Sequence, residues 1–565
     1  MYILSVEQMR QAEAAADAAG QTYAMMMESA GQAVATAVRQ LTDPQGLRIL
    51  VLVGPGNNGG DGLVAAFHLQ QMGGLVTCYI WKRKVEGDAN FARARDAGCR
   101  ILWAQEDAGW AALRQECEQA NVVLDALLGT GTDRPITGDL AELLGVVRET
   151  VERRRRARLP WMKEALQVID PTLKVPERPE MPLVVAVDVP SGVNCDTGAL
   201  DPATVPADVT VTFGFPKRGQ FIFPGAGVLG KLLIAEIGIP PRLVKDCHLH
   251  LVTTKMVTER LPQRPLDAHK GTFGRALIIA GSVNYTGAPA LAAAAATRVG
   301  AGLVTLALAR SVFPIVAAKL YEPTYILLPE SLGVVSDEAV DVLCERIQEF
   351  DAMLIGPGLG QADEVVRFVH TFLSGELRLP RRRTRIGFVE TTAPAGTPSS
   401  TCRLPPTVID ADALNALAKA EEWWKHIPAG CVLTPHPGEM ARLLGCTTEE
   451  VQADRIGIAS RAAQQWGQIV VLKGAHTVIA SPDGETYILP FANPVLATAG
   501  TGDVLAGAIV GLMAQGLSPL DAALVGGFLH GMAAEEVEFS RQISCGVVAS
   551  DLLPALPVVI QRLRA

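Results

Sequence analysis

The chain has 565 residues, of which 49% are hydrophobic and 19% are charged, and its formal net charge is −9. This length exceeds what one hydrophobic core supports, so we expect roughly two to four domains. The negative charge argues against a nucleic-acid partner, and no clean apolar stretch reaches the ~20 residues that a membrane span needs. The N-terminal segment carries acids and is not a signal peptide, and the ten cysteines show no metal-ligand spacing, which together favour a cytoplasmic protein.

The first motif follows a predicted buried strand at residues 47–53 and has the sequence GPGNNGGDG, at residues 54–62. A helix and a second strand at 75–81 come next, and this order favours a parallel α/β sheet. The glycines satisfy the GxGxxG pattern of dinucleotide-binding proteins. However, the acid expected after the second strand is replaced by the basic run at 82–84, so an ordinary NAD-binding site is not supported.

Two further apolar strands in this half end at Asp125 and Asp188, each followed by a glycine-bearing loop. Loops at the carboxyl ends of parallel strands converge on one crevice, so Asn58, Asp125, Asp188 and Ser191 are expected to meet there. Oxygen ligands of this kind suit a hard cation such as K⁺ or Mg²⁺. The same residues also suit simple turns that close short loops, but three such loops together favour a site. Lys217 would face either this crevice or solvent.

The strand-and-glycine-loop pattern starts again in the second half, so we divide the chain into a first domain at 1–245 and a second at 246–565. A run of arginines and prolines at about 153–180 is predicted to be an insertion in the first domain. A basic, then Thr/Pro/Ser-rich stretch at about 381–406 is predicted to be an insertion in the second.

The second half carries its most distinctive stretch at 493–516, where small residues precede an apolar helical pattern. Glycines 500 and 502 permit close backbone approach, and the free N–H groups of a first helical turn attract an anion. Asp503 would repel a phosphate, so we interpret it as a proton acceptor, although it would also simply favour the helix dipole. Lys473 directly follows a buried strand and requires an anionic partner, a role that a nucleotide phosphate would fill.

Six motifs together carry a family resemblance: GPGNNGGDG, DALLGTG, DVPSG, TPHPGE, KGAHT and GTGDVLAG. The chain resembles the bifunctional NAD(P)H-hydrate repair enzymes of bacteria over nearly its whole length, apart from the two insertions. Its first half is similar to NAD(P)H-hydrate epimerases and its second half to ADP/ATP-dependent NAD(P)H-hydrate dehydratases. The resemblance implies an α/β protein with two doubly wound domains, a Rossmann-like three-layer sandwich followed by a ribokinase-like domain.

The resemblance also implies the activity. The substrate would be NADH or NADPH that is hydrated at C6 of the nicotinamide ring. The first domain would interconvert the R and S hydrates with the help of K⁺. The second would dehydrate the S form with ADP or ATP and Mg²⁺, giving AMP or ADP and phosphate; bacterial relatives suggest ADP. Phosphorylation makes chemical sense here, because phosphate leaves carbon more readily than hydroxide does.

Particular residues follow from the resemblance, with Asp188 and Asp503 as catalytic residues. The hydrate in the first domain would contact Asn57, Asn58, Gly59, Gly60, Asp61, Gly129, Thr130, Gly131, Thr132, Asp133, Arg134, Pro135 and Asp188. K⁺ would be held by Asn58, Asp125 and Ser191. In the second domain the hydrate would contact Ala288, Gly360, His436 and Asp503. The nucleotide would contact Lys473, Gly474, Ala475, His476, Thr477, Thr501 and Gly502. Arg134 lies in the loop where eukaryotic epimerases usually carry a lysine.

Other functions fit parts of the sequence. One is a ribokinase-like kinase of a small alcohol fused to a nucleotide-binding domain, and another is a module that binds nucleotide without turnover. The choice between ADP and ATP, and between NADH and NADPH hydrate, stays open. We also expect a homo-oligomer, with the methionine run at 25–27 and the alanine-rich segment at 285–302 as contact faces.

Overall fold

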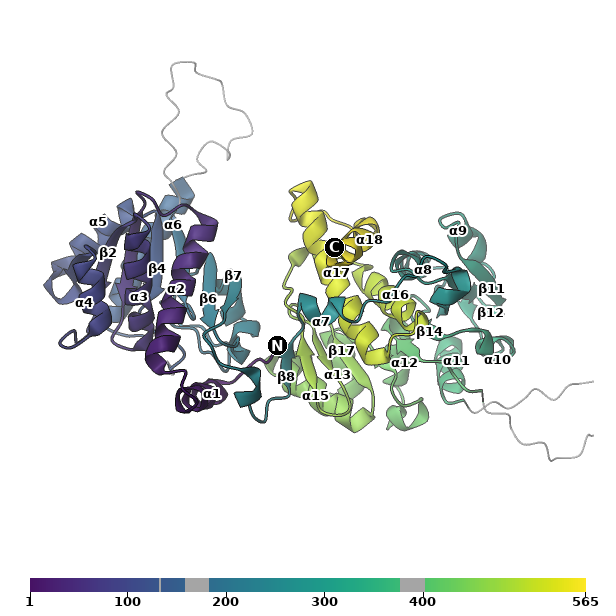
Figure 1. Cartoon of the computed structure of the whole chain (residues 1–565). Helices are drawn as coiled ribbons and strands as arrows, with labels where there is room; N and C mark the ends of the chain where they lie inside the picture. Colours follow the sequence, from purple (N-terminus) through teal and green to yellow (C-terminus); the bar gives the residue numbers. More distant parts are fainter. Residues whose placement is uncertain (132–133, 158–181, 376–401, 565) are drawn as a thin grey trace, which may run out of the picture. The chain divides into compact units, whose positions relative to one another are not determined.

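The computed structural model describes residues 1–131, 134–157, 182–375 and 402–564 (Figure 1). It forms two compact units, Tyr2–Cys247 and His248–Ala565, with Met1 grouped with the second. We refer to them as the N-domain and the C-domain. Most of the two predicted insertions, as well as Thr132 and Asp133, lie outside the described residues. No helix in the described ranges is long and apolar enough to cross a membrane.

The N-domain contains, within the described residues, a seven-stranded sheet in the order β3-β2-β1-β4-β5-β6-β7. Every pairing is parallel. The strands are β1 (Arg48–Val53), β2 (Leu75–Ile80), β3 (Arg100–Trp103), β4 (Val122–Ala126), β5 (Leu183–Val187), β6 (Val209–Phe213) and β7 (Lys231–Ala235). The strand order reverses between β1 and β4, which is where open α/β sheets bind ligands.

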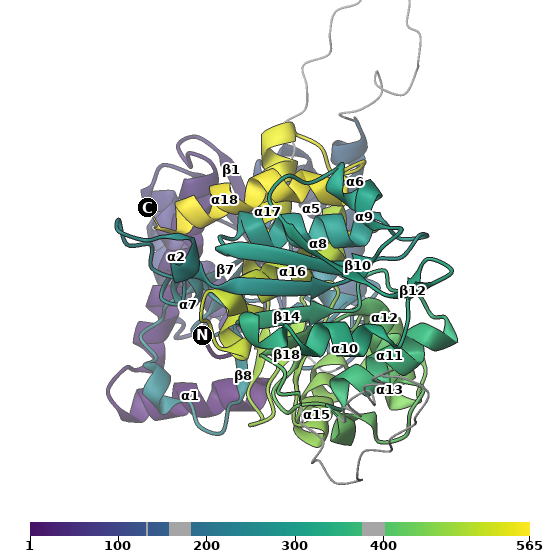
Figure 2. The same ribbon diagram turned by 90° about the vertical axis from the view of Figure 1, so that its right-hand side faces the viewer.

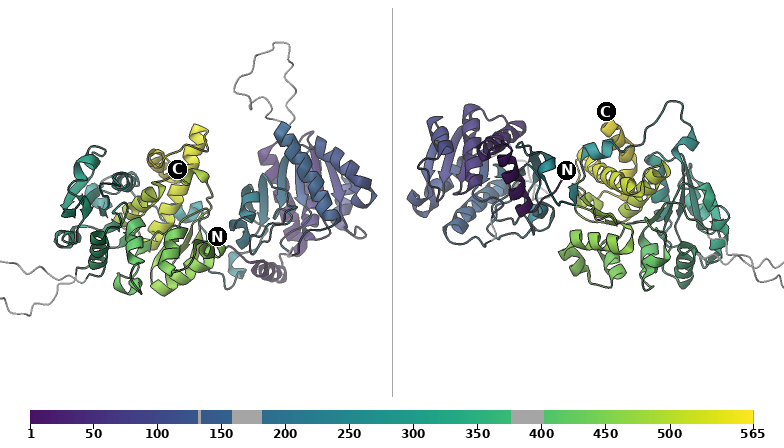
Figure 3. Two further views of the ribbon diagram at one scale, coloured as in Figure 1. Left: turned by 180° about the vertical axis from the view of Figure 1, so that it is seen from behind. Right: turned by 60° about the horizontal axis from the view of Figure 1, so that its bottom comes forward.

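Helices cover both faces of this sheet, because alternate residues of β1 pack against two different groups of helices. Ile49, Val51 and Val53 pack in one buried cluster with α1 (Val6–Ala18), α2 (Tyr23–Leu41), α3 (Asn57–Gln71) and α4 (Ala89–Asp96). Leu50 and Leu52 pack in another with α5 (Ala111–Gln119) and α6 (Asp139–Ala157). The two faces can be followed in Figures 1 and 3. The predicted Rossmann-like three-layer sandwich is therefore confirmed.

The C-domain contains, in the part that the structure describes, a ten-stranded sheet in the order β11-β10-β9-β14-β15-β16-β17-β18-β19-β8. Pairing is parallel from β11 to β17, and β18 and β19 then add as an antiparallel hairpin. The strands are β8 (Leu249–Leu251), β9 (Arg275–Ile279), β10 (Leu303–Ala309), β11 (Thr324–Leu328), β14 (Ala352–Ile355), β15 (Thr407–Ile409), β16 (Val432–Leu433), β17 (Ile469–Leu472), β18 (Val478–Ala480) and β19 (Thr486–Ile488). A separate two-stranded sheet joins β12 (Glu330–Ser331) to β13 (Val334–Val335).

Figure 2 shows the C-domain sheet with helices above and below it. One group comprises α8 (Gly287–Arg298), α16 (Thr501–Ala514), α17 (Pro519–Arg541) and α18 (Ala549–Arg564). The other comprises α10 (Ala339–Cys344), α11 (Asp363–Leu373), α12 (Ala411–Leu417), α13 (Pro437–Leu444) and α15 (Arg455–Trp466). Shorter helices are α7 (Thr254–Thr258), α9 (Phe313–Ala317) and α14 (Thr448–Ala453). The predicted doubly wound α/β class of the second domain is confirmed.

The alanine-rich helix α8 packs tightly against α16. A Cβ added to Gly507 would lie 2.2 Å from the backbone oxygen of Ala292, and one added to Gly511 would lie 2.8 Å from Cα of Ala296. Ala292, Ala293, Ala295 and Ala296 are all fully buried. The face that we expected to join two copies of the chain is thus used inside the C-domain. Small residues on both helices allow this close approach.

Candidate functional site

The loop after β1 shows why its motif needs glycine. A Cβ on Gly54 would lie 1.8 Å from the backbone oxygen of Leu127, and one on Gly59 would lie 2.1 Å from that of Gly54. The loop therefore packs backbone to backbone against the loop after β4. Helix α3 starts immediately at Asn57, and its N-cap residue, Gly56, provides no side-chain hydrogen bond. The first turn of α3 consequently offers backbone N–H groups to an anion.

Asn58, Asp125 and Ser191 come together at this edge of the sheet, as the sequence predicted for the three loops. The Ser191 hydroxyl donates to Asp125 Oδ1 at 2.6 Å, and its backbone N–H donates to Asp125 Oδ2 at 2.8 Å. Asn58 Nδ2 donates to the backbone oxygen of Leu128 at 2.9 Å. The backbone N–H of Leu128 in turn donates to Ser191 Oγ at 2.9 Å.

The chemistry of these three residues fits a small cation. Asn58 Oδ1 is buried and has no hydrogen-bond partner. Burial raises the pKa of Asp125, although hydrogen bonds from Ser191 and Leu127 oppose that shift. A cation with oxygen ligands would satisfy the amide oxygen and offset the buried charge. The described residues contain no cluster of three His, Cys, Asp or Glu side chains that would indicate a different kind of metal centre.

Asp188 follows β5 and has a backbone φ of 65°, in the left-handed region that non-glycine residues rarely adopt. Its Oδ1 accepts hydrogen bonds from Lys217 Nζ at 2.6 Å and from the Thr212 hydroxyl at 2.9 Å. The Lys217 side chain is only 1% exposed. The open question about Lys217 is therefore settled: it faces the crevice and pairs with Asp188, where a strained backbone is often functional.

Two more acidic side chains, Asp61 and Glu13, interact electrostatically with Asp188. Burial raises the pKa of Asp61 on α3 well above its usual range, and Asp188 and Glu13 raise it further. Burial also raises the pKa of Glu13 on α1, while Lys217 lowers it and Asp188 raises it. A carboxyl group whose neutral form is favoured by burial thus stands near an ion-paired carboxylate. This is the arrangement that an acid and a base acting on one substrate require.

Sequence reasoning did not single out Glu13, because it is one of several acids on a helix that carries no motif. The loop after β4 packs close to the cation cluster, since a Cβ added to Gly129 would lie 3.2 Å from Cβ of Asn58. In that loop the exposed residues include Gly131, Arg134 and Pro135. Thr132 and Asp133 lie outside the described residues.

In the C-domain, α16 begins directly after Gly500, whose φ of 92° favours glycine. The Thr501 hydroxyl bonds to the backbone oxygens of Leu496 and Thr498 at 2.9 Å and so fixes the turn. Asp503 lies in the first turn of α16. Burial, followed by the charge of Asp410, raises the pKa of Asp503 to about 7. Asp503 is therefore tuned to accept a proton near neutral pH.

Lys473 follows β17 and reaches towards the start of α16. A Cβ on Gly502 would lie 3.4 Å from its Nζ. Nζ donates to Asp410 Oδ1 at 2.8 Å and lies 3.8 Å from Glu439 Oε2. Burial acts to lower the pKa of Lys473, but these two carboxylates outweigh burial and raise it. The expectation that Lys473 requires an anionic partner is thus met within the protein by Asp410, and its contact with a nucleotide phosphate stays a prediction.

The predicted hydrate-binding residues of this domain lie on separate elements: Ala288 in α8, Gly360 in the loop after β14, His436 at the start of α13 and Asp503 in α16. His436 caps α13, and its Nδ1 accepts from the backbone N–H of Gly438 at 3.0 Å. Its Nε2 lies 3.5 Å from Glu439 Oε1, which links it to the Lys473 cluster. Burial, then Lys473 and Arg442, lowers the pKa of His436, so the ring favours its neutral form. The backbone N–H of Gly360 donates to Asp412 Oδ2 at 2.8 Å. A Cβ added to Gly358, in the same loop, would lie 3.0 Å from Cβ of Ala288.

The turn Lys473–Thr477 joins β17 to β18, and its Gly474 and Ala475 are exposed. Thr477 bonds to the backbone oxygen of Gly474 at 2.9 Å, and burial lowers the pKa of His476 to about 4. Arg455, at the start of α15, packs on this turn: a Cβ on Gly474 would lie 2.4 Å from its Nη1. It donates to the backbone oxygens of Leu472 and Lys473, and burial lowers its pKa to about 10. No sequence motif marked Arg455.

Comparison with known proteins identifies both halves. A family model described as NAD(P)H-hydrate dehydratase matches residues 276–378 and 395–557, and one described as YjeF-related protein N-terminus matches residues 23–219. The ADP/ATP-dependent NAD(P)H-hydrate dehydratase from Bacillus subtilis, co-crystallised with ATP/Mg²⁺, is 31% identical over 56% of this chain and 98% of its own, with a TM-score of 0.45.

Full-length relatives match as well. The bifunctional NAD(P)H-hydrate repair enzyme of Moorella thermoacetica is 37% identical over 100% of this chain and 97% of its own length. That of Escherichia coli is 32% identical over 97% of this chain and 91% of its own. Since these matches extend through both domains and both clusters of site residues, the chain belongs to the family of bifunctional NAD(P)H-hydrate repair enzymes.

Proposed function

We propose that the chain repairs hydrated NADH and NADPH in two steps. The N-domain interconverts the R and S hydrates at C6 of the nicotinamide ring. The C-domain then dehydrates the S hydrate to NADH or NADPH at the expense of ADP or ATP. The observation that carries this proposal is the presence, in one chain of this family, of an acid–base crevice at Asp188 and a phosphate-type helix terminus at Asp503.

Epimerisation requires the C6–O bond to break and to form again on the opposite face of the ring. The neutral Asp61 carboxyl donates its proton to the departing hydroxyl, so that water leaves and the ring nitrogen stabilises the cation at C6. Water then adds to the other face and gives a proton to Asp188. Lys217 holds the Asp188 carboxylate in place. Proton exchange with solvent returns both carboxyl groups to their starting state.

We assign K⁺ to Asn58, Asp125 and Ser191. When bound, the ion would supply a fixed positive charge beneath the crevice. The orphaned Asn58 Oδ1 and the buried Asp125 carboxylate support this choice. The protein groups themselves link the loops after β1, β4 and β5 through the hydrogen bonds described above. Residues 57–61, the loop at 129–135 and Asp188 are proposed to contact the hydrate.

In the C-domain we propose that Asp503 takes the proton of the C6 hydroxyl as the terminal phosphoryl group of the nucleotide transfers to it. The backbone N–H groups at the start of α16, with Lys473 and Arg455, would steady the charge on the phosphoryl oxygens. Phosphate then leaves C6 and the proton on C5 passes to solvent, which restores the double bond. ADP thus yields AMP and phosphate.

The remaining assignments in this domain concern the residues that contact the nucleotide and the hydrate. Residues 473–477, Thr501 and Gly502 are proposed to contact the nucleotide, and Ala288, Gly360 and His436 the hydrate. Mg²⁺ usually binds through one or two carboxylates together with nucleotide phosphates. Asp410 and Glu439, which converge on Lys473, are the groups that would hold it. When bound, it would neutralise charge on those phosphates.

A homo-oligomer is also part of the proposal. With the alanine face of α8 buried, the surface that supports it is the start of α2, where Tyr23 is 48% exposed and Met25 is 51% exposed. Light scattering on the full chain measures its mass. A Met25→Glu variant that lowers the mass supports this contact, and an unchanged mass contradicts it.

The test of the function is a product balance. Purified S hydrate of NADH, ADP and the full chain should give one AMP and one phosphate for each NADH formed. Repeating the assay with ATP compares the two donors, and repeating it with the NADPH hydrate compares the two substrates. If neither donor gives NADH while a small alcohol is phosphorylated, the chain is a kinase and the proposal is wrong.

A further inference from the structure

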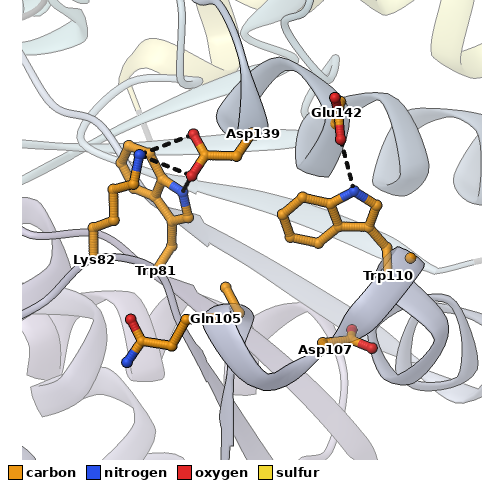
Figure 4. A pocket seen from close by; sticks show the side chains of 9 residues that line it. Trp81, Lys82, Gln105, Asp107, Trp110, Asp139 and Glu142 are labelled. Atoms are coloured by element: carbon orange, nitrogen blue, oxygen red, sulfur yellow. Dashed lines mark hydrogen bonds and ion pairs between the residues drawn. The ribbon is translucent and has the colours of Figure 1, made fainter.

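A cavity lies in the N-domain, and its lining includes none of the residues placed in the Asp188 crevice or the cation cluster (Figure 4). Its volume is about 430 Å³, within the range of small-molecule sites, which is roughly 300–1,000 Å³. Its lining includes two tryptophans, a lysine and several groups that accept hydrogen bonds: Trp81, Trp110, Lys82, Gln105, Asp139 and Glu142. In Figure 4 the two indole rings stand on either side of the space.

Both indole rings are held in place by their polar edges. Trp81 Nε1 donates to Asp139 at 3.4 Å, and Trp110 Nε1 donates to Glu142 at 3.1 Å. The Lys82 ammonium lies 5.1 Å from the centre of the Trp81 ring and donates to the same Asp139 at 3.0 Å. Because both N–H groups are already bonded and the Lys82 ammonium lies over one face of Trp81, a ligand is left with the other face of Trp81 and with the ring of Trp110. A flat, neutral ring that stacks is the ligand that such faces select.

The location of the cavity relates it to the crevice at Asp188. Trp81 and Lys82 directly follow β2, Gln105 follows β3, and Asp139 and Glu142 begin α6. The cavity therefore shares the carboxyl edge of the sheet with the crevice, which lies at β1, β4 and β5. Neighbouring strands are about 4.8 Å apart, so β2 and β5 are separated by roughly 14 Å along this edge.

Groups suited to phosphate lie between the two places. The start of α3, which has no side-chain cap, follows β1, the strand between β2 and β4. Arg83 lies beside it, because its Nη1 donates to the backbone oxygens of Gly54 at 3.1 Å and Gly56 at 2.7 Å. The carboxyl edge of the sheet thus carries, in order, the aromatic rings, a helix N-terminus of the kind that binds phosphate, and the acid–base crevice.

We infer that this cavity, which we call the tryptophan pocket, binds the adenosine end of the dinucleotide hydrate while its nicotinamide ring reacts at Asp188. This rests on the proposed epimerase activity. Adenine stacks on the indole faces, and the acceptors of Gln105, Asp139 and Glu142 face its amino group and the ribose hydroxyls. The pyrophosphate lies at α3 beside Arg83. The basic run after β2, which does not support an ordinary NAD site, thereby has a use of its own.

The experiment compares two substrates on the full chain without ADP, so that only epimerisation proceeds. One is the R hydrate of NADH, and the other is the R hydrate of reduced nicotinamide mononucleotide, which lacks the adenosine. Chromatography follows the appearance of each S hydrate above the rate without enzyme. The variants are Trp110→Ala, Trp110→Phe and the control Arg114→Ala. Arg114 is an exposed residue of α5, the helix that Trp110 precedes, and it pairs with Glu149.

Stacking of a base on an aromatic side chain is worth about 1–3 kcal/mol, so Trp110→Ala should raise KM for the NADH hydrate roughly 5- to 150-fold. Its kcat should stay near that of the wild type, and its kinetics on the mononucleotide hydrate should not change. Trp110→Phe should recover most of the loss, and Arg114→Ala should show none.

An equal loss on both substrates would mean that Trp110 only supports the fold, and equal KM values for the two substrates in the wild type would mean that the adenosine is not bound. Either result overturns the inference and leaves the epimerase activity standing. A wild type that epimerises neither substrate removes both.

Discussion

In each domain, burial determines the acid–base behaviour of the catalytic carboxyl groups more than their residue type does. Asp503 and Asp61 are ordinary carboxylates in the sequence, yet burial raises the pKa of both. Asp188, by contrast, carries its own buried ammonium partner in Lys217. The same residue type is therefore suited to accept a proton in one place and to donate one in another.

Asp503 gives a prediction with a definite pH. As a base it must lose its proton, so kcat/KM for dehydration should rise with pH and level off above about 7. Asp503→Asn should lower kcat roughly 10²- to 10⁴-fold at pH 8. A raised carboxylate pKa destabilises the folded state increasingly as pH rises from the unfolded pKa to the folded one. The variant should therefore gain stability relative to the wild type from about pH 4 to about pH 7, as melting curves would show.

Asp61 gives a second prediction. Asp61→Asn preserves the size of the side chain but removes its transferable proton. The rate of R-to-S conversion should fall roughly 10²- to 10⁴-fold, whereas dehydration of the S hydrate with ADP should be unchanged. The melting temperature should change little, because burial already favours the neutral carboxyl. An unaltered epimerisation rate would show that Asp61 is not the acid.

Arg455 gives a third prediction. Its guanidinium is largely buried and its hydrogen bonds go to neutral oxygens beside the proposed nucleotide loop. Arg455→Met should raise KM for ADP roughly 10- to 150-fold, since a hydrogen bond to a charged group contributes roughly 1.5–3 kcal/mol. Arg461→Met, on the same helix but 67% exposed and paired with Asp454, is the control. Equal KM values in both variants would contradict the role.

At the scale of elements, the close contact between α8 and α16 positions the start of α16. Gly507→Val would force side-chain atoms into the backbone of Ala292. We expect this variant to lower the melting temperature of the C-domain and the dehydration rate together, and to leave epimerisation intact. Gly145→Ala in α6, where an added Cβ meets nothing within 4 Å, should be neutral or stabilising by up to about 1 kcal/mol. Similar behaviour of the two variants would contradict this account.

Strands, glycine loops and their order were predictable from the sequence because each depends on local pattern. The apolar run of β1 and the loops after β1, β4 and β5 placed Asn58, Asp125 and Ser191 on one edge. Pairings between distant segments were not predictable. Lys217 is 29 residues from Asp188, and Lys473 is 63 residues from Asp410, so no spacing rule joins them.

For the same reason sequence reasoning missed Arg455 and Glu13. Neither belongs to a motif, and each matters only because folding brings it beside a loop or an acid from another part of the chain. The tryptophan pocket is a similar case: Trp81 and Trp110 lie after different strands and carry no periodic pattern. Burial and charge at such places become visible only in three dimensions.

At the scale of the whole molecule, each domain contains its own sheet and its own site residues. The Asp188 crevice uses residues of Tyr2–Cys247, and the Asp503 site uses residues of His248–Ala565. A substitution in one site should therefore remove one activity and spare the other. Asp188→Ala is the sharpest case, because the C-domain should still repair the S hydrate at the wild-type rate.

The most direct test supplies separated R and S hydrates of NADH to the full chain with ADP, K⁺ and Mg²⁺, and follows the absorbance of NADH. The wild type should restore both hydrates completely. Asp188→Ala should restore the S hydrate quickly and the R hydrate only as fast as it epimerises without enzyme. If the wild type restores neither hydrate with ADP or with ATP, or if Asp188→Ala restores both equally fast, the two-step account is wrong.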